Sequence, residues 1–451
     1  MIYPIIELSS KDIVKAVSGT MILGDGSEKI SSVSCDSRTT EDTTLFIPLK
    51  GERFDGHDFI DDVCRRGIGG IICEGEITPS APFVIKVEST AQALLDLASY
   101  YRSLFNILVT GLTGSVGKTT TKELIASVVS QKYKTLATKG NFNNNIGVPY
   151  TIFGLNSSHE AAVIEMGMSN FGEISVLSRC ARPHIGVITN IGTSHIEYLG
   201  SQEGILKAKS ELFDGMDSES TVILNGDDPY LLSLKGKVNC KEMIFVGIDN
   251  KSADILATDV ISGEGGCSFS LDGVKYSINL AGAHNVYNAL CAIVVGRTLG
   301  IDTESIKKGL ESYRSDGIRQ NIVNINGYKV INDCYNSSPQ SAKAALGVLE
   351  CVEAKRRIAV LGDIAELGSM TEELLRGLGT AVEKSNVDVL VTVGEVSKFI
   401  SMEAASKECY GFSDSPQAAE FLKGFLKAED AVLIKGSRCM KMERIFEILN
   451  Q

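Results

Sequence analysis

The feature that most constrains this fold is a glycine-rich turn between an apolar run and a helical pattern, at residues 108–120. The segment reads Leu-Val-Thr-Gly-Leu-Thr-Gly-Ser-Val-Gly-Lys-Thr-Thr. Glycines in such a turn let backbone N–H groups close around phosphate oxygens, and the lysine reaches the β/γ-phosphates. The match is not strict, because Leu112 stands where the usual pattern has glycine. The turn predicts a nucleotide phosphate site; an ordinary strand–turn–helix joint is the alternative. The candidate contacts are Thr113, Gly114, Ser115, Val116, Gly117, Lys118 and Thr119.

Length and composition indicate several α/β domains and exclude some partners. A chain of 451 residues is too long for one core. Its net charge of −12, without a long basic run, argues against nucleic acid or an acidic membrane as the main partner. The eleven cysteines form no C-x-x-C pair and indicate a reducing compartment. Neither a signal peptide nor an apolar run long enough to cross a bilayer is recognisable. We expect a cytoplasmic monomer.

Alternating strand and helix patterns predict three α/β units, at 1–104, 105–315 and 316–451. The middle unit is expected to hold a mostly parallel sheet covered by helices on both faces. Within it, residues 253–280 alternate apolar and polar side chains and predict a small antiparallel insertion. The predicted strands are 30–35, 44–48, 70–73, 83–87, 106–110, 161–165, 185–190, 221–225, 329–332, 357–361, 387–393 and 431–434. The predicted helices are 57–66, 90–104, 118–131, 283–299, 338–351, 371–385 and 417–427.

Two polar residues at predicted strand ends are candidates for Mg²⁺ binding. Glu165 ends the apolar strand 161–165, and His195 follows the strand 185–190. Since the carboxyl ends of parallel strands meet at one edge of a sheet, both can share a site with Thr119. The alternatives are a solvated carboxylate and a packed or surface histidine.

Four further segments have both a structural and a functional interpretation. The amide-rich stretch 141–149 is either a turn before a helix or a loop that binds an anionic substrate. His284-Asn285-x-x-Asn288 is either a helix cap or a contact to a purine. Residues 332–339 and 435–438 follow strands, where α/β folds bind ligands, but ordinary loops fit them too. Lys209 lies in a helix of mixed charge, and its chemistry alone does not single it out.

In this order the motifs resemble the Mur ligase family, the ATP-dependent amide-forming ligases of peptidoglycan synthesis. The resemblance covers essentially the whole chain. The motifs are Cys35-Asp-Ser-Arg38, Phe46-Ile-Pro-Leu-Lys-Gly51, Asp55-Gly-His-Asp-Phe59, the phosphate loop, Glu165-Met-Gly167, Thr189-Asn-Ile-Gly192 with His195, Asn225-Gly-Asp-Asp-Pro229, His284-Asn285 and Lys435-Gly-Ser-Arg438.

Within the family, the chain is most similar to the members that join D-Ala-D-Ala to UDP-N-acetylmuramoyl-tripeptide. The segments 143–149 and 361–368 and the pattern Tyr335-Asn336-x-x-Pro339 carry this similarity. The Asp-Asn-Pro-Arg motif that binds diaminopimelate in the tripeptide-forming members is absent from the sequence. Cys334 and Ser337-Ser338 depart from the pattern of the matched members, which bears on acceptor preference rather than on the reaction.

The resemblance implies a UDP-binding first unit, an ATP-binding central unit and a Rossmann-like third unit. By position match, Lys118 and Thr119 bind the ATP phosphates and, with Glu165, a first Mg²⁺. His195 matches a ligand of a second Mg²⁺. Lys209 matches a lysine that is carbamylated in several relatives and then binds metal, which requires a neutral amine. The remaining implied contacts are Asn288 to adenine, Arg319 and Asp333 to the nucleotide on closure of the third unit, Ser37 and Arg38 to uridine, and Asn143, Asn144, Tyr335 and Asn336 to the substrates.

The implied reaction makes an amide in two steps. It belongs to peptidoglycan synthesis, on which cell shape and cell division depend. A tripeptide carboxylate attacks the γ-phosphate of ATP and becomes an acyl phosphate, and the amine of D-Ala-D-Ala then displaces phosphate. Positioning and neutralisation of developing charge are the protein's main tasks. Closure of the units around the site is a further hypothesis. Two alternatives remain: a sister ligase that uses another amine, and a nucleotide-dependent regulator.

Overall fold

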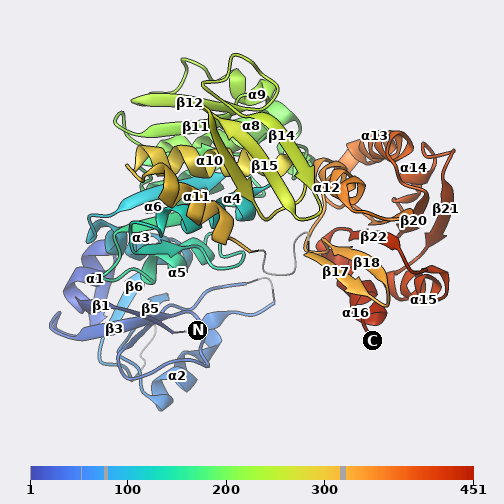
Figure 1. Cartoon of the computed structure of the whole chain (residues 1–451). Helices are drawn as coiled ribbons and strands as arrows, with labels where there is room; N and C mark the ends of the chain where they lie inside the picture. Colours follow the sequence, from blue (N-terminus) through green and yellow to red (C-terminus); the bar gives the residue numbers. More distant parts are fainter. Residues whose placement is uncertain (1, 52, 76–79, 315–320) are drawn as a thin grey trace.

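The computed structural model describes residues 2–51, 53–75, 80–314 and 321–451. Figure 1 shows three α/β parts that follow one another along the chain, coloured blue, teal to yellow, and orange to red. The α/β fold with a parallel central sheet is confirmed. The exact boundaries at 104/105 and 315/316 stay predictions. None of the described helices is both long and apolar enough to cross a membrane.

The first part is a mixed sheet with the strand order β1-β3-β4-β5-β6-β2. The outer pairs β1–β3 and β2–β6 are antiparallel, and the inner pairs are parallel. The sequence predicts no element before residue 30, and in β1 the burial alternates irregularly, so this strand has no clear period. The bounds are β1 (Tyr3–Ser9), α1 (Ser10–Ala16), β2 (Thr20–Leu23), β3 (Lys29–Ser34), β4 (Thr44–Phe46), α2 (Ile60–Arg66), β5 (Gly70–Glu74), β6 (Val84–Val87) and α3 (Thr90–Ser103).

Two tyrosines join the first part to the central one. The Tyr101 hydroxyl on α3 donates to the Leu155 carbonyl (2.8 Å) and accepts from the Ile6 N–H (3.0 Å). Tyr150, in α5 (Gly147–Phe153), stacks on Tyr3 with ring centroids 4.3 Å apart. Because each tyrosine contacts residues of both parts, the first part is held against the segment that follows the amide-rich loop 141–149.

The central part is a parallel sheet with the strand order β13-β12-β11-β10-β7-β9-β8 among the described residues. The strand that leads into the phosphate loop, β7, lies between β9 and β10. The strand bounds are β7 (Leu108–Thr113), β8 (Thr135–Ala137), β9 (Ala161–Glu165), β10 (Ile185–Ile188), β11 (Thr221–Asn225), β12 (Glu242–Gly247) and β13 (Ile255–Leu256). The loops after β7, β9 and β10 therefore leave the same edge of the sheet side by side.

Helices cover both faces of this sheet, as the sequence predicts. On one face α4 packs against α10, and its buried Leu124, Ile125, Val128 and Val129 confirm the predicted apolar side. The other face is covered by α6 and α8, whose buried side chains include Leu177 and Ile205, respectively. The bounds are α4 (Lys118–Val129), α6 (Glu173–Ala181), α7 (Ile196–Leu199), α8 (Gln202–Ser210), α9 (Pro229–Leu232), α10 (His284–Thr298) and α11 (Thr303–Ser312).

The antiparallel insertion predicted at 253–280 is confirmed as a sheet of β14 (Thr258–Gly263), β15 (Gly266–Leu271) and β16 (Val274–Ile278). It lies beside α12 of the third part in Figure 1. The ammonium of Lys329 in the third part contacts the Glu264 carboxylate at the tip of β14–β15 (2.6 Å). The insertion therefore forms part of the junction between the two parts.

The third part is a sheet of order β17-β18-β22-β19-β20-β21 in the described chain, in which β17 alone runs antiparallel to its neighbour. The sequence had indicated four of these strands, and the edge strands β17 and β21 were missed. The bounds are β17 (Asn321–Ile325), β18 (Tyr328–Asn332), α12 (Pro339–Cys351), β19 (Arg356–Gly362), α13 (Thr371–Lys384), β20 (Val389–Val393), α14 (Lys398–Ser401), β21 (Glu408–Phe412), α15 (Ser415–Phe425), β22 (Asp430–Lys435) and α16 (Glu443–Leu449).

Candidate active site

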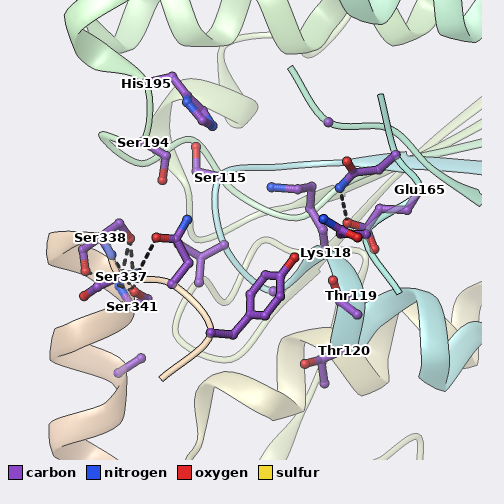
Figure 2. A pocket seen from close by; sticks show the side chains of 18 of the residues that line it. Ser115, Lys118, Thr119, Thr120, Glu165, Ser194, His195, Ser337, Ser338 and Ser341 are labelled. Atoms are coloured by element: carbon purple, nitrogen blue, oxygen red, sulfur yellow. Dashed lines mark hydrogen bonds between the residues drawn. The ribbon is translucent and has the colours of Figure 1, made fainter. Parts of the chain in front are cut away.

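A cavity of about 420 Å³ lies where the phosphate-loop edge of the central sheet meets the third part. Figure 2 shows Lys118, Thr119 and Glu165 on one side of it and the start of α12, with Ser338 and Ser341, on the other. The cavity thus brings together segments that are far apart in the sequence, from the phosphate loop to Lys435. Among the predicted site residues, it is lined by Ser115, Val116, Gly117, Lys118, Thr119, Asn143, Asn144, Glu165, His195, Asn288, Asp333, Tyr335 and Asn336.

The phosphate loop has backbone conformations that require glycine. Gly117 has a φ of +84°, and a Cβ at this position would lie 2.8 Å from Asn288 Oδ1. Gly114 has a φ of +152°, and a Cβ there would collide with the Thr189 side chain. Glycine avoids both the strain and the collision, so the loop can turn tightly into α4.

The segment after β10 holds this loop in place, a role that sequence reasoning did not assign. Asn190 Oδ1 accepts from the Val116 N–H, and Asn190 Nδ2 donates to the Val116 carbonyl, each at 2.9 Å. The Thr189 hydroxyl donates to the same carbonyl (2.7 Å). The Ser115 hydroxyl accepts from the Gly192 N–H (2.8 Å). The Ser115 N–H also donates to the Asn190 carbonyl (3.0 Å). These five hydrogen bonds fix Ser115 and Val116, and none of them uses the N–H groups at the start of α4.

Two lysines meet at the loop. Lys118 Nζ and Lys209 Nζ each donate to the Gly114 carbonyl at 2.9 Å. Lys209 is 1% exposed, so the solvated helix face considered from the sequence is wrong for this residue. Burial lowers the pKa of Lys209 well below its ordinary value, and the Lys118 charge lowers it further. The structure thus favours a neutral amine at Lys209.

Glu165 lies at the end of β9 with one carboxylate oxygen bonded and one unpartnered. Its Oε1 accepts from Asn143 Nδ2 (2.8 Å), the dashed contact beside Glu165 in Figure 2. Its backbone N–H donates to Thr138 Oγ1 (3.0 Å). Its Oε2 is buried and has no hydrogen-bond partner. A Cβ at Gly167 would lie 2.9 Å from the Asn143 side-chain amide, so a larger residue there would displace this amide. The solvated-carboxylate alternative is wrong, since Glu165 is 1% exposed.

His195 links the central and third parts. It starts α7 with a φ of +64°, and its Nδ1 lies 2.6 Å from Glu366 Oε2. The contact with the imidazole lowers the pKa of Glu366. The Glu366 carbonyl also accepts from the Glu197 N–H (3.3 Å). Glu366 lies in the segment 361–368 that carries the family resemblance, but nothing in the local sequence indicates a partner in another part of the chain.

The amides on α10 and in the amide-rich loop already have protein partners. Asn288 Oδ1 accepts from the Thr121 hydroxyl, and its Nδ2 donates to Asn285 Oδ1, both at 2.9 Å. The cap residue of α10 is Ala283, so the helix-cap interpretation of these asparagines is wrong. Asn144 Oδ1 accepts from the Gly147 N–H (2.9 Å), as the turn-before-helix alternative expects, although Asn144 also lines the cavity.

The third part contributes a buried ion pair to the cavity wall. Lys435 Nζ contacts Asp333 Oδ2 (2.6 Å) and donates to the Asn336 carbonyl (2.9 Å). The pair holds the loop that carries Tyr335 after β18, and it joins two segments singled out from the sequence, 332–339 and 435–438. Arg319, the other predicted nucleotide contact, lies outside the described residues.

The predicted uridine contacts lie elsewhere. Ser37 and Arg38 follow β3 in the first part, and neither is among the described residues that line the cavity. The Arg38 guanidinium makes two hydrogen bonds to the Asp36 carboxylate, 2.8 and 2.9 Å long, which hold the pKa of Asp36 well below its usual range. The Cys35 N–H donates to the Tyr150 hydroxyl (3.2 Å), so this turn is fixed to the central part.

The donor set of the cavity fits a nucleotide with a hard cation. The described residues contain no group of three or more His, Cys, Asp or Glu that could hold a metal ion. Mg²⁺ is commonly bound by one or two carboxylates together with substrate phosphates, so a dedicated cluster is not needed. The unpartnered Oε2 of Glu165 and the Thr119 hydroxyl at the start of α4 are oxygen donors, the kind of atom that Mg²⁺ binds.

Comparisons with known proteins agree with this site. Three family descriptions match the chain in order: "Mur ligase family, catalytic domain" at 29–102, "Mur ligase middle domain" at 112–296, and "Mur ligase, glutamate ligase domain" at 318–438. The chain is 37% identical to the UDP-N-acetylmuramoyl-tripeptide–D-alanyl-D-alanine ligase of Bacillus subtilis (strain 168), with 98% of both chains covered.

Two solved structures are similar over nearly their whole length. The crystal structure of MurF from Acinetobacter baumannii has a TM-score of 0.92 and 30% identity, with 99% of this chain and 100% of that chain covered. The MurF ligase from Thermotoga maritima, in complex with ADP, has a TM-score of 0.84 and 28% identity, with 93% and 96% covered.

Proposed function

Because this chain belongs to the Mur ligase family, we propose that it joins D-alanyl-D-alanine to UDP-N-acetylmuramoyl-tripeptide at the expense of ATP. The products are UDP-N-acetylmuramoyl-pentapeptide, ADP and phosphate. The observation that carries the proposal is the cavity itself, in which the phosphate loop faces the polar loop after β18. This arrangement lets one chain hold a nucleotide and an acceptor on opposite sides of a reacting carboxyl group.

The phosphate side of the cavity binds and orients ATP. The start of α4, which no side chain caps, presents its N–H groups and a positive dipole end to the β- and γ-phosphates, and the Lys118 ammonium adds a charge. Thr189 and Asn190 keep the loop preorganised, so little reorganisation is needed when ATP binds. Such positioning is the main contribution that a protein makes to phosphoryl transfer.

Thr119 and Glu165 are the residues that would hold Mg²⁺, and the buried unpartnered Oε2 of Glu165 fits this role. Mg²⁺ supplies charge neutralisation at the transferred phosphate when it is bound. Asn143 keeps the Glu165 carboxylate oriented through its hydrogen bond to Oε1. His195 is proposed as a ligand of a second ion through Nε2, while its Nδ1 keeps the contact with the Glu366 carboxylate that orients the ring.

Lys209 is proposed to act as a carbamate. A neutral amine can add CO₂ and become an anion, and the lowered pKa of Lys209 supplies the neutral form. A carbamate at Lys209 would form an ion pair with the Lys118 ammonium, whereas a protonated Lys209 would repel it.

The remaining predicted contacts are part of the same proposal. Asn288 and Asp333 are assigned to the nucleotide, and so is Arg319. The tripeptide and the dipeptide are assigned to Asn143, Asn144, Tyr335 and Asn336, which line the cavity, and uridine to Ser37 and Arg38 in the first part. Closure of the three parts would exclude water from the acyl phosphate. We place the reaction in the cytoplasm, carried out by a monomer.

The test is phosphate release from ATP in the presence of UDP-N-acetylmuramoyl-tripeptide, with D-Ala-D-Ala or single amino acids as acceptor. Release that requires D-Ala-D-Ala, together with a pentapeptide product by mass, supports the proposal. Release with another amine would move the chain to a sister activity in the family. No release with any acceptor would overturn the ligase and favour a nucleotide-dependent regulator. Lys118→Met serves as the inactive control.

A further inference from the structure

Lys122 is a fully buried lysine one turn beyond the phosphate loop. It lies on α4, four residues after Lys118, and its side chain is 0% exposed. It does not line the described cavity, so it makes no direct contact with a ligand there. A buried ammonium is costly unless its N–H groups and its charge are matched, so its presence needs a structural explanation.

The Lys122 ammonium is anchored at three points. It donates to the Thr138 carbonyl (2.6 Å) and approaches the Gly140 carbonyl at 3.5 Å. The Glu123 carboxylate, 40% exposed, lies 2.8 Å away and supplies the counter-charge. Three acceptors match the three N–H groups of an ammonium. Two of these acceptors belong to the segment that follows β8, so the lysine ties that segment to the helix of the phosphate loop.

The tied segment supports Glu165 from two sides. Thr138 Oγ1 accepts from the Glu165 N–H (3.0 Å), which sets the backbone of the carboxylate. Further along the same segment, Asn143 Nδ2 donates to Glu165 Oε1 (2.8 Å), which sets its side chain. The Asn143 carbonyl accepts from the Gly167 N–H (2.7 Å) and fixes the far end of the segment beyond β9.

We propose that Lys122 is a positioning residue that holds the segment 138–143, and through it Glu165, at a set distance from Thr119. The inference rests on the proposed function, because it takes Glu165 and Thr119 as ligands of Mg²⁺. Thr119 and Lys122 are three residues apart on α4, so both project from neighbouring places on one helix. Lys122 therefore links the two candidate ligands through a single buried group.

The experiment compares Lys122→Met with the unchanged chain in binding of a fluorescent ADP analogue at increasing Mg²⁺ concentration. Loss of a group that orients a metal ligand typically costs about 10- to 100-fold in metal affinity or activity, so the half-saturating Mg²⁺ concentration should rise by roughly that factor. Affinity for the analogue without Mg²⁺ should change less than threefold, about 0.6 kcal/mol, because Lys118 and the loop are untouched. Equal Mg²⁺ dependence in both proteins would overturn the proposal.

Three further variants separate positioning from a general loss of stability. Lys132→Met removes an exposed lysine that donates to the Gly300 carbonyl (2.8 Å), and it should leave the Mg²⁺ dependence unchanged. Thr138→Val removes the acceptor of the Glu165 N–H and should reproduce the Mg²⁺ defect, whereas Thr138→Ser should not. If Lys122→Met does not fold, the two Thr138 variants test whether the segment 138–143 positions Glu165. An unchanged Mg²⁺ dependence in Thr138→Val would then overturn the proposal.

The binding measurement needs neither the tripeptide nor D-Ala-D-Ala. Its failure is therefore distinguishable from failure of the proposed function. A chain that binds nucleotide normally but releases no phosphate would overturn the ligase while leaving the role of Lys122 intact.

Discussion

Lys118 and Lys209 share one acceptor, since the Nζ atom of each lies 2.9 Å from the carbonyl oxygen of Gly114. Lys118 is the first residue of α4, and Lys209 lies near the end of α8, ninety-one residues later in the chain. Two ammonium groups at one carbonyl repel each other, and the buried one loses its proton more readily. The chemistry of the site depends on which form Lys209 takes.

We predict that Lys209 forms a carbamate. In ¹³CO₂-enriched buffer, a carbamate resonance should appear at a lower pH than for exposed lysines and grow as the pH rises, because only the neutral amine reacts. Lys209→Met should lack this resonance and lose about 10- to 100-fold in ligation rate, the usual cost of removing a group near a metal site. Full activity of the variant, with the resonance absent from the unchanged chain, would refute the prediction.

The buried lysine should also make stability depend on pH. The pKa of Lys209 is lowered in the folded state, whereas in the unfolded state it is about 10.4. Between these values the unfolded chain binds more protons, so the free energy of unfolding rises with pH through this window. The slope from this group is at most about 1.4 kcal/mol per pH unit.

Urea unfolding in CO₂-free buffer at several pH values between 7 and 10 measures this effect. Lys209→Met has no titrating group at position 209, so it does not pay the cost of burying a charged amine at low pH. The difference in free energy of unfolding between the variant and the unchanged chain should therefore shrink as the pH rises. A difference that stays constant over the window would show that Lys209 does not titrate there.

The hydrogen bonds from Asn190 predict a role in nucleotide affinity. Asn190→Ala removes both bonds to Val116, and each is worth about 0.5–1.5 kcal/mol. Part of that energy preorganises the loop, so affinity for a fluorescent ADP analogue should fall by roughly tenfold. Asn156→Ala is the matched control, because it also removes a hydrogen bond from a backbone N–H, that of Ser158, to an asparagine side chain. This variant should bind the ADP analogue with unchanged affinity. Equal affinities in the two variants would exclude this role.

The ion pair of Lys435 with Asp333 predicts a large effect on stability. The two side chains are 3% and 13% exposed, so Lys435→Met leaves a carboxylate buried without its partner. Breaking a buried pair in this way costs about 3–5 kcal/mol. Urea unfolding followed by circular dichroism measures the loss. The double variant Lys435→Met with Asp333→Asn should recover part of it, and a single variant as stable as the unchanged chain would contradict the argument.

Much of the fold followed from local patterns. The strands at 161–165 and 221–225 were predicted from continuous apolar runs. The helix at 118–131 and the antiparallel insertion were predicted because apolar residues repeat there at the period of a helix and of a strand. Most of the strands that the sequence did not predict lie at sheet edges, namely β1, β2, β8, β13, β17 and β21, whereas β12 is an inner strand of the central sheet. The burial of β1 is irregular, so it has no clear period in the sequence.

By itself, the sequence determined the phosphate loop, the acidic end of β9 and the order of the motifs, because each is written in contiguous residues. Only the tertiary structure decided that Lys209 and Lys122 are buried and what they bond to, and that His195 meets Glu366. The local charge pattern around Lys209 suggested a solvated helix face, but the side chain is buried. Burial and pairing arise from contacts between segments tens to hundreds of residues apart, and a side chain's protonation and role follow from those contacts.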